Sequence, residues 1–482
     1  MQDRGLFLFK GGESLMQTTQ DLLLIEKIDG DTLTPISIYQ RIKGKKKFLL
    51  ESSLKHENSG RYSIIGSNPA FELIGNGPVS TIIRGNTKEI IEEKSLSLVK
   101  KLLPKMQVEL PFDLPITGGA IGYVGYDNIR QYEDIGPEAK DEIGIPDVHL
   151  LFFEDLIIFD HSEQIIYLIA TPLSETTTEE ELQEKINKRK EELTAPFVEE
   201  KGEVSLTAFQ PSITKQAFVE KVNKAKEYIR NGDIFQVVPS QRMSAKIEGS
   251  PFSYYRGLRI KNQSPYMYFL DFEEYAVVGS SPESLIKAHN GKVITNPIAG
   301  TRPRGATIEE DKDLANDLLE DEKELAEHKM LVDLARNDVG KVSHFGSVKV
   351  EKYLKVEKYK HVMHLVSEVS GDLKEEYSSV DALISCLPAG TVSGAPKIRA
   401  MQIINELEGA KRGIYSGAVG YFSKNGNMDF ALAIRTMVIK GNNAYIQAGA
   451  GIVYDSVPEK EYEETIHKLK VFLEGQHDFI NR

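Results

Sequence analysis

The chain contains 482 residues, of which 40% are hydrophobic and 27% charged, and its formal net charge is −13 at pH 7. Because a single hydrophobic core seldom exceeds roughly 250–300 residues, this length predicts at least two lobes. The negative charge argues against a nucleic-acid-binding protein, and it means that an anionic substrate needs a local positive site. No apolar run approaches the roughly 18–20 residues of a membrane span, so we expect no membrane insertion.

The first lobe is predicted to span residues 18–196. Strand-like segments separated by glycine and asparagine turns favour a largely antiparallel sheet. These segments are residues 47–53, 63–75, 80–85, 149–160 and 164–172. An acidic start followed by mixed charges predicts a solvated helix over residues 176–193. Residues 197–212 have no helical period and are interpreted as a linker.

The second lobe is predicted to span residues 213–475. Phe218, Val222, Ala225 and Ile229 repeat at helical spacing and predict an opening helix. Further helices are predicted over residues 311–338, 378–387, 393–409 and 458–475. Strands are predicted over residues 234–243, 266–272, 275–281, 292–300, 347–358, 417–423, 428–440 and 443–454. Meanders interrupted by long helices, without regular βαβ alternation, favour an α+β fold.

A single cysteine, Cys386, lies among apolar residues. It cannot form a disulfide within the chain, which is typical of a protein of the reducing cytoplasm. The apolar neighbours predict a buried structural thiol.

Two pairs of glutamates have a spacing that places both carboxylates on one helical face. They are Glu324 with Glu327 and Glu461 with Glu464. Two facing pairs of this kind supply the oxygen ligands that Mg²⁺ prefers. Exposed helices often carry acidic pairs, so the spacing alone leaves a solvated acidic face as the alternative.

Glycine-rich segments are candidate anion sites. Gly449 and Gly451 weaken a strand unless a ligand or another strand approaches the backbone closely. Gly300 and Thr301 precede two arginines, and Thr391 precedes a predicted helix start, where backbone amides favour anions. None of these segments matches the phosphate loops of nucleotide-binding proteins.

His364 is the strongest candidate for proton transfer in the sequence. Imidazole titrates near neutral pH, which suits a general acid or base. The surrounding residues 361–371 are largely apolar, so a structural histidine is the alternative.

Seven motifs occur together in one order and carry a family resemblance. They are PIAGTRPRG, DEKELAEHKMLVDLARND, HVMHLVSEVSG, PAGTVSGAPKIRAM, RGIYSGAVGYFS, DFALAIRTM and QAGAGIVYDSVPEKEYEET. In these motifs the chain resembles the chorismate-utilising enzymes, and among them the large, aminating subunits of the anthranilate synthase group. The resemblance covers about residues 21–474 and is strongest after residue 213.

The resemblance implies a four-layer α/β/β/α sandwich with two mainly antiparallel sheets. It also implies that chorismate and ammonia are converted to anthranilate and pyruvate with Mg²⁺, the first step of tryptophan biosynthesis. The implied chorismate-binding residues are Gly300, Thr301, Tyr415, Arg435, Gly449, Ala450, Gly451 and Lys468. The implied Mg²⁺ ligands, direct or through water, are Glu324, Glu327, Glu461 and Glu464, with Glu327 and Glu464 expected to make direct contact.

Three further residues are implied in the chemistry. Glu283 matches the general acid of the family, which protonates the leaving C4 hydroxyl. His364 and Thr391 lie in motifs tied to the later elimination of pyruvate, and we hypothesise that His364 removes the C2 proton.

Two positions distinguish this chain from its relatives. Isochorismate- and salicylate-forming members carry a water-activating lysine where this chain has Gln236, and glutamine cannot deprotonate water. Aminodeoxychorismate synthases typically read PIKGT, whereas Ala299 occupies the lysine position here. Both differences favour ammonia as the nucleophile and anthranilate as the product.

The first lobe resembles the regulatory region of the family. Ser52, Pro265, Tyr266 and Met267 are expected to line a tryptophan feedback site, with ordinary core strands as the alternative. Residues 118–127 are interpreted as a segment near a partner contact, with an ordinary sheet turn as the alternative.

The sequence has no glutaminase nucleophile elbow and no second cysteine. We therefore expect ammonia to come from a separate glutamine amidotransferase subunit, in a heteromer with two copies of each chain. Two other functions stay open at this point. An aminodeoxychorismate synthase component would stop before pyruvate is lost, and a catalytically dead amino-acid-binding regulator would keep the scaffold without the reaction.

Overall fold

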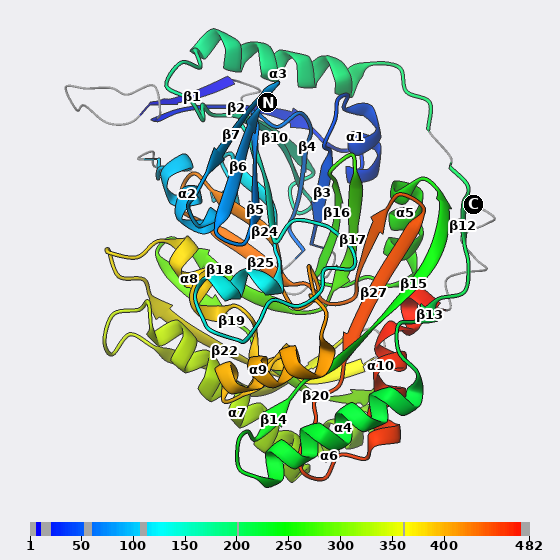
Figure 1. Cartoon of the computed structure of the whole chain (residues 1–482). Coiled ribbons are helices and arrows are strands. Elements are labelled where there is room, and N and C mark those ends of the chain that lie inside the picture. The colour runs from blue at the N-terminus through cyan, green and yellow to red at the C-terminus, as the bar shows by residue number, and fades with distance from the viewer. Residues whose placement is uncertain are drawn as a thin grey trace.

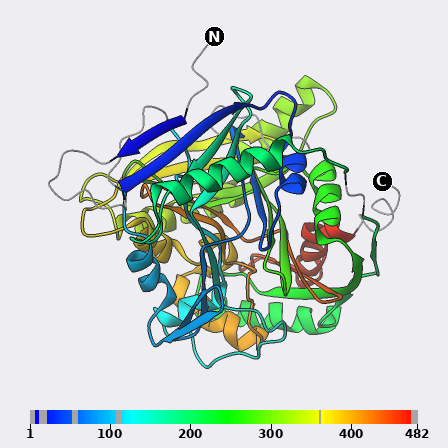
Figure 2. The same cartoon turned by 90° about the horizontal axis from the view of Figure 1, so that it is seen from above.

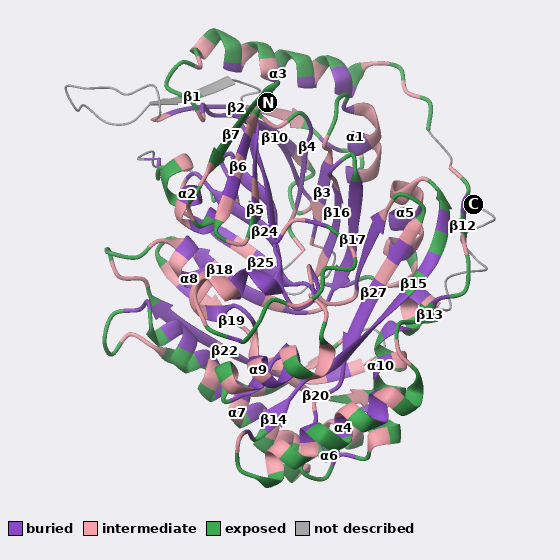
Figure 3. Cartoon of the chain, in the orientation of Figure 1, coloured by how far each residue is buried: buried purple, intermediate pink, exposed green. Residues whose placement is uncertain are grey.

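Two large antiparallel sheets lie face to face, and helices cover their outer faces (Figure 1). The computed structural model describes residues 6–10, 21–52, 60–106, 113–199, 202–359 and 362–473. This arrangement confirms the predicted four-layer α/β/β/α sandwich. Figure 3 shows that the strands are mostly buried, whereas the outward sides of the covering helices are exposed.

Within the described ranges, the first sheet contains thirteen strands. In spatial order they are β1 (Leu6–Lys10), β2 (Leu22–Asp29), β11 (Ile165–Ala170), β10 (Asp155–Asp160), β4 (Tyr62–Gly66), β3 (Phe48–Glu51), β16 (Tyr266–Asp271), β17 (Tyr275–Ser281), β26 (Thr436–Lys440), β27 (Asn443–Gly449), β15 (Ser240–Gly249) and β12 (Val204–Leu206), with β13 (Gln210–Pro211) also paired to β15.

In the part of the chain that the structure describes, the second sheet contains twelve strands. In spatial order they are β20 (Ile298–Pro303), β22 (Val362–Asp372), β19 (Lys292–Thr295), β18 (Ser284–His289), β25 (Met428–Leu432), β24 (Ala418–Ser423), β8 (Gly119–Val124), β9 (Val148–Phe153), β5 (Phe71–Asn76), β6 (Val79–Arg84) and β7 (Thr87–Ile91), with β21 (Lys349–Lys358) also paired to β22. A two-stranded sheet joins β14 (Gln236–Val237) to β23 (Gly394–Ala395).

Helices form the two outer layers. The first sheet is contacted by α1 (Pro35–Arg41), α3 (Glu179–Thr194), α5 (Pro251–Lys261) and α10 (Pro458–Leu473). The second sheet is contacted by α2 (Ser95–Leu102), α6 (Ile308–Glu320), α7 (Glu322–Gly340) and α8 (Ser379–Cys386). At the end of the sandwich, α4 (Lys215–Arg230) packs on α10, and α9 (Lys397–Glu408) packs on β14 and β23. Figure 2 shows α3 crossing the strands in the view from above.

Aromatic side chains fill the layer between the two sheets. Phe48 and Tyr268 of the first sheet belong to the same buried cluster as Tyr123 and Phe153 of the second sheet. The rings of Phe48 and Phe153 lie 4.8 Å apart between centroids. Burial of aromatic surface from both faces therefore fixes the two sheets against each other.

Each sheet takes strands from both predicted lobes. In the first sheet β3 pairs with β16, with Glu51 opposite Met267. In the second sheet β8 pairs with β24, with Gly122 opposite Gly420. The predicted linker at 197–212 itself contributes β12 and β13 to the first sheet. The lobes at 18–196 and 213–475 thus interleave in space, and the domain division stays a prediction.

Several local predictions need correction. The helix expected over 311–338 is two helices, because Asp321 adopts an extended conformation and its side chain caps α7 by accepting from the amides of Lys323 and Glu324. The strand expected over 443–454 ends at Gly449. The helices α1, α2 and α5 were not predicted from the sequence.

Residues 118–127 form no exposed turn. Most of them lie in β8, a fully buried strand between β24 and β9. A Cβ atom on Gly119 would lie 2.1 Å from the carbonyl oxygen of Phe422, and one on Gly122 would lie 2.0 Å from that of His149. The glycines allow close strand packing, so the alternative of an ordinary turn is wrong for the β8 residues, whereas a partner contact near this segment stays a prediction.

Two further sequence predictions concern Cys386 and membrane insertion. Cys386 is buried, as predicted, and burial raises the pKa of its thiol to about 12. Among the residues that the structure describes, no helix combines the length and the apolar character needed to cross a bilayer.

Candidate active site

A buried carboxyl group, that of Glu283, lies between β17 and β18. The hydroxyl of Thr391, in the short 3₁₀ helix η3 (Gly390–Val392), donates a hydrogen bond to its Oε1 over 2.9 Å. Burial raises the pKa of Glu283 to about 7, although Thr391, Lys468 and Arg435 all lower it. A carboxyl group with this pKa is about half protonated at neutral pH, so a substantial fraction can act as a general acid.

Two cationic side chains act on this acid. Arg435, between β25 and β26, has a left-handed backbone conformation with φ of +48°. Within the described part of the chain its guanidinium has no hydrogen-bond or ion-pair partner, and burial lowers its pKa whereas Glu283 raises it. Lys468 donates to the carbonyl oxygen of Gly449 over 3.0 Å. These groups form the local positive site that an anionic substrate needs in a chain of net negative charge.

His364 lies on β22 with a defined pattern of hydrogen bonds. Its Nδ1 is 2.9 Å from the carbonyl oxygen of Gly300 and 3.0 Å from Oγ1 of Thr301. Because a carbonyl oxygen can only accept, Nδ1 carries the hydrogen and Nε2 keeps its lone pair. Burial lowers the pKa of His364, so the ring is neutral at pH 7 and Nε2 can accept a proton.

A bulge in β20 presents Gly300 to this histidine. The register of β20 against β22 shifts between Ala299 and Thr301, and Gly300 has φ of +71°. A Cβ atom at Gly300 would lie 3.0 Å from Cδ1 of Leu318 and 3.2 Å from Oε2 of Glu324. Glycine is therefore required by the backbone conformation and by the neighbouring side chains.

The second glycine segment is closely packed. A Cβ atom at Gly449 would lie 2.8 Å from the carbonyl oxygen of Pro239 and 2.9 Å from the hydroxyl of Tyr415. One at Gly451 would lie 2.9 Å from Nε2 of Gln236. Close packing thus accounts for both glycines, and contact of residues 449–451 with chorismate stays a prediction.

The four predicted metal-binding glutamates lie on α7 and α10. Burial raises the pKa of Glu324, and the charge of Glu327 adds to the shift. Burial likewise raises the pKa of Glu461, with a further increase from Glu464 and a decrease from Lys323 at the start of α7. The charge of Lys323, at the start of α7, thus acts on Glu461 of α10.

These glutamates do not form a preassembled metal centre. Among the described residues, no group of three or more histidine, cysteine, aspartate or glutamate side chains is arranged to hold a metal ion. Glu327 Oε1 instead accepts from Nε2 of Gln236 over 2.8 Å, and Glu464 forms an ion pair with Lys468 at 2.7 Å. The buried Oε1 of Gln236 has no partner within the described chain. Paired carboxylates that repel one another nevertheless have the chemistry of hard-cation ligands.

The predicted inhibitor site lies at the β3–β16 junction. The antiparallel register that pairs Met267 with Glu51 places Tyr266 opposite Ser52. The Ser52 hydroxyl accepts from the amide of Gly60 over 2.6 Å. Tyr266 donates to Asp429, and Met267 is buried. Residues far apart in the sequence thus come together, while tryptophan binding stays a prediction.

Two residues near the site that the sequence did not single out are Arg412, which is buried, and Glu408, whose side chain is buried. Glu408 is at the end of a predicted helix and Arg412 follows it, positions where charged side chains are usually solvated. The arginine lies in the motif RGIYSGAVGYFS, but its burial depends on contacts with Val238 and Val392, which are remote in the sequence.

A two-sheet sandwich with a buried acid beside unpaired positive charge defines an enzyme for anionic substrates, and family comparison is consistent with this class. Residues 46–474 match the family model described as chorismate binding enzyme. The match covers most of the sequence, so the chain belongs to the chorismate-binding enzyme family.

Within this family, the chain is similar to relatives named anthranilate synthase component 1. The protein of Lactococcus lactis subsp. lactis is 49% identical over 452 residues, which cover 93% of this chain and 98% of the relative. That of Acetivibrio thermocellus is 46% identical over 469 residues, which cover 93% and 94%. The crystal structure of anthranilate synthase component I from Streptococcus pneumoniae has a TM-score of 0.80 and 47% identity, covering 92% of this chain and 98% of that one.

Proposed function

We propose that the chain is the aminating component of an anthranilate synthase, which converts chorismate and ammonia to anthranilate and pyruvate. The observation that carries this proposal is the buried Glu283 carboxyl group, hydrogen-bonded to Thr391 and adjusted to a pKa of about 7 beside Arg435. The extensive similarity to relatives of that name supports the choice of reaction.

The first half of the reaction replaces a hydroxyl group by an amine. Arg435 and Lys468 bind the carboxylates of chorismate, and the planar guanidinium suits a bidentate contact. Glu283 donates its proton to the C4 hydroxyl, the C4–O bond breaks, and water leaves. Ammonia adds at C2 as the ring double bonds shift, and the proton that the new ammonium group loses balances the one that Glu283 supplied.

The second half removes the enolpyruvyl group. Nε2 of His364 accepts the proton from C2, and the C3–O bond breaks as the ring becomes aromatic. The enolpyruvyl methylene carbon takes up a proton, and pyruvate is released. The hydrogen bond from Nδ1 to Gly300 fixes the imidazole tautomer that this step requires.

Mg²⁺ is the proposed cofactor, held by Glu324, Glu327, Glu461 and Glu464. Bound there, the ion would neutralise charge on a substrate carboxylate. The raised pKa values of Glu324 and Glu461 support this assignment, because a cation relieves the repulsion within each acidic pair. Glu327 and Glu464 are the proposed direct ligands.

The nucleophile is proposed to be ammonia from a glutamine amidotransferase subunit. The printed name of the relatives, component 1, supports the existence of a second component. Gln236 is hydrogen-bonded to Glu327 and cannot act as a base toward water. We also propose that tryptophan inhibits the enzyme by binding beside Ser52, Pro265, Tyr266 and Met267, which couples the β3–β16 junction to the catalytic residues.

Turnover of chorismate with Mg²⁺ and an ammonium salt tests this function. Anthranilate is followed by its fluorescence and pyruvate by coupling to lactate dehydrogenase, and we expect equal amounts of both. An amino product without pyruvate would instead identify an aminodeoxychorismate synthase component. No consumption of chorismate at all would favour the regulatory alternative and overturn the proposal.

A further inference from the structure

The guanidinium of Arg412 is buried and uses all of its N–H donors. Nε and NH2 donate to the two carboxylate oxygens of Glu408, over 2.9 and 2.7 Å. NH1 donates to the carbonyl oxygen of Val392 over 2.7 Å and to Oγ of Ser416 over 3.1 Å. NH2 also donates to the carbonyl oxygen of Val238 over 2.6 Å. No donor is left for a substrate, so Arg412 acts only through the groups that it holds.

The two backbone acceptors of Arg412 belong to segments that carry the proposed site. Val392 directly follows Thr391, the hydrogen-bond donor to Glu283. Val238 directly precedes Pro239, whose carbonyl oxygen accepts from the amide of Ala450 over 3.1 Å. The guanidinium of Arg412 thus connects the segment that contains Thr391, beside Glu283, to the segment that contains Pro239, beside residues 449–451.

The aromatic neighbours of Arg412 extend this arrangement. The guanidinium carbon lies 5.3 Å from the ring centroid of Tyr415 and 4.8 Å from that of Tyr126. Tyr415 is a proposed substrate residue, and its hydroxyl lies next to Gly449. Arg412 therefore also sets the position of the Tyr415 ring through a cation–π contact.

Glu408 connects the pair to the first sheet. Its Oε1 accepts from both the amide and the hydroxyl of Ser240, over 2.7 and 2.8 Å. Ser240 lies opposite Gly449 in the pairing of β15 with β27. The carboxylate thus anchors the strand end that bears Gly449.

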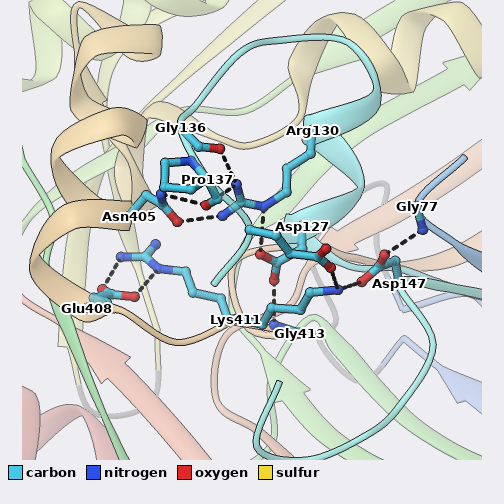
Figure 4. Close-up of polar contacts among 12 residues, drawn as sticks. Gly77, Asp127, Arg130, Gly136, Pro137, Asp147, Asn405, Glu408, Lys411 and Gly413 are labelled. Atoms are coloured by element: carbon cyan, nitrogen blue, oxygen red, sulfur yellow. Dashed lines mark hydrogen bonds and ion pairs between the residues drawn. The ribbon is translucent and has the colours of Figure 1, made fainter. Parts of the chain in front are cut away.

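The backbone on both sides of Arg412 is fixed independently. The amide of Gly413 donates to Asp127 over 2.9 Å, and Lys411 forms an ion pair with Asp147 at 3.4 Å. Figure 4 shows these contacts together with Glu408, at the point where the loop after α9 meets residues 126–147. The backbone of Arg412 is therefore held in place, and its side chain reaches the segments that contain Val238 and Val392.

We propose that Arg412 and Glu408 form a positioning pair that holds the segments bearing Thr391, Tyr415 and Gly449 in register for catalysis. The inference rests on the proposed function for its catalytic consequence. Burying an ion pair is seldom a net gain in stability over apolar residues of the same size. The planar guanidinium of Arg412 joins three segments, and its role is to orient them. Small displacements of catalytic groups lower the reaction rate strongly.

The test compares Arg412→Lys with Arg189→Lys. Arg189 is a matched control, because it is also buried, bonds to Asp155 and Glu192 over 2.7 and 2.9 Å, and donates to a backbone carbonyl, but lies on α3. We expect Arg412→Lys to lower kcat roughly ten- to a hundredfold. Arg189→Lys should lower thermal stability alone. Lysine keeps the charge at position 412 but cannot reproduce the fork.

Two readouts separate positioning from stability. Hydrogen–deuterium exchange of peptides that cover residues 238–240, 391–393 and 449–450 should accelerate in Arg412→Lys and stay unchanged in Arg189→Lys. The descending limb of the pH–rate profile should move to higher pH in Arg412→Lys, because a displaced Thr391 no longer lowers the pKa of Glu283. Glu408→Gln, which keeps the guanidinium, should show the same changes to a lesser extent.

The outcomes are distinct. If Arg412→Lys shows wild-type exchange in the three peptides and wild-type kcat, the positioning role is wrong. If Arg412→Lys does not fold, the same comparison is made with Glu408→Gln, and wild-type exchange there overturns the inference. If the wild-type protein forms no anthranilate, the proposed function fails, while the exchange data still decide whether the pair holds these segments.

Discussion

Thr391 donates a hydrogen bond to Glu283 over 2.9 Å, across 108 positions of sequence. This contact favours the ionised carboxylate, whereas burial favours the protonated acid. Burial is the larger of the two effects, which leaves the pKa at about 7. The balance between the hydrogen bond from Thr391 and the burial of the carboxyl group therefore sets the fraction of Glu283 that is protonated at neutral pH.

Replacement of Glu283 by glutamine should separate activity from stability. We expect turnover to fall by roughly 10²- to 10⁴-fold, since glutamine cannot donate the proton. The folded-state pKa of about 7 lies above the usual value of 4.5, so wild-type stability decreases as pH rises from 4.5 through 7. Glu283→Gln should thus be more stable than wild type at pH 8, by at most about 3 kcal/mol.

Urea unfolding of both proteins at pH 8 and pH 5 measures this difference. The advantage of the glutamine variant should shrink at pH 5, where the wild-type carboxyl group is protonated in the folded state. A variant that is less stable than wild type at pH 8 would show that the carboxylate is stabilised in the site, contrary to the raised pKa.

Replacement of His364 by alanine should interrupt the second half of the reaction. The variant loses the Nε2 acceptor that Gly300 orients through Nδ1. We expect pyruvate release to slow and an amino intermediate to accumulate, as detected by chromatography of quenched reactions. His328→Ala is a control for the loss of a buried ring, since His328 is also buried and its Nε2 is 2.7 Å from the hydroxyl of Ser367. Wild-type anthranilate formation by His364→Ala, with no intermediate, would exclude the role.

Alanine substitutions at Gly300 and Gly441 separate the effect of backbone conformation from the effect of new side-chain contacts. Both have positive φ, +71° and +54°, so alanine at either position should lower stability by about 1 kcal/mol. Only at Gly300 would the new methyl group meet other atoms, those of Leu318 and Glu324. We therefore expect Gly300→Ala alone to reduce kcat/KM for chorismate, while thermal melting shows a loss in both. Equal kinetics of the two variants would contradict a functional role for the bulge.

Local patterns in the sequence predicted most helices, because periodicity and capping are encoded within one element. The division between α6 and α7 was missed, since one capping aspartate, Asp321, outweighs a continuous helical period. The order of strands was not predictable either. The pairing of Glu51 with Met267 joins residues more than two hundred positions apart, and no local pattern specifies it.

The candidate site shows the same limit. Family motifs predicted roles for Glu283, His364 and Arg435, but the contact of Thr391 with Glu283 could be seen only in the tertiary fold. Arg412 was missed because an arginine after a helix is usually solvated. Its burial follows only from the meeting of β14, η3 and the loop after α9, which sequence reasoning did not place together.

Replacement of Ser52 by phenylalanine tests the proposed tryptophan site. The change removes the acceptor of the Gly60 amide and adds a ring opposite Tyr266. We expect tryptophan to inhibit wild-type turnover and to have much less effect on Ser52→Phe, with little change in turnover when tryptophan is absent. Titration of both proteins with tryptophan, by activity and by calorimetry, measures this. Equal responses of the two proteins would remove Ser52 from the site.

Replacement of the proposed metal-binding glutamates should weaken Mg²⁺ binding without unfolding the protein. We expect Glu327→Gln and Glu464→Gln each to lower the affinity for Mg²⁺ about tenfold, because each variant removes one carboxylate ligand. Glu463→Gln is the control, because this neighbour is exposed and pairs with Lys215 instead. Calorimetric titration with MgCl₂ in the presence of chorismate measures the affinity directly, and chelation followed by Mg²⁺ addition should abolish and restore turnover.

The pH dependence of this binding has a defined sign. Because the pKa values of Glu324 and Glu461 are raised, both carboxyl groups take up protons more readily than free glutamate, and Mg²⁺ must displace those protons. Affinity should therefore fall as pH decreases toward 5, with proton release on binding in the same range. Affinity independent of pH, or an equal loss in Glu463→Gln, would mean that the ion binds elsewhere.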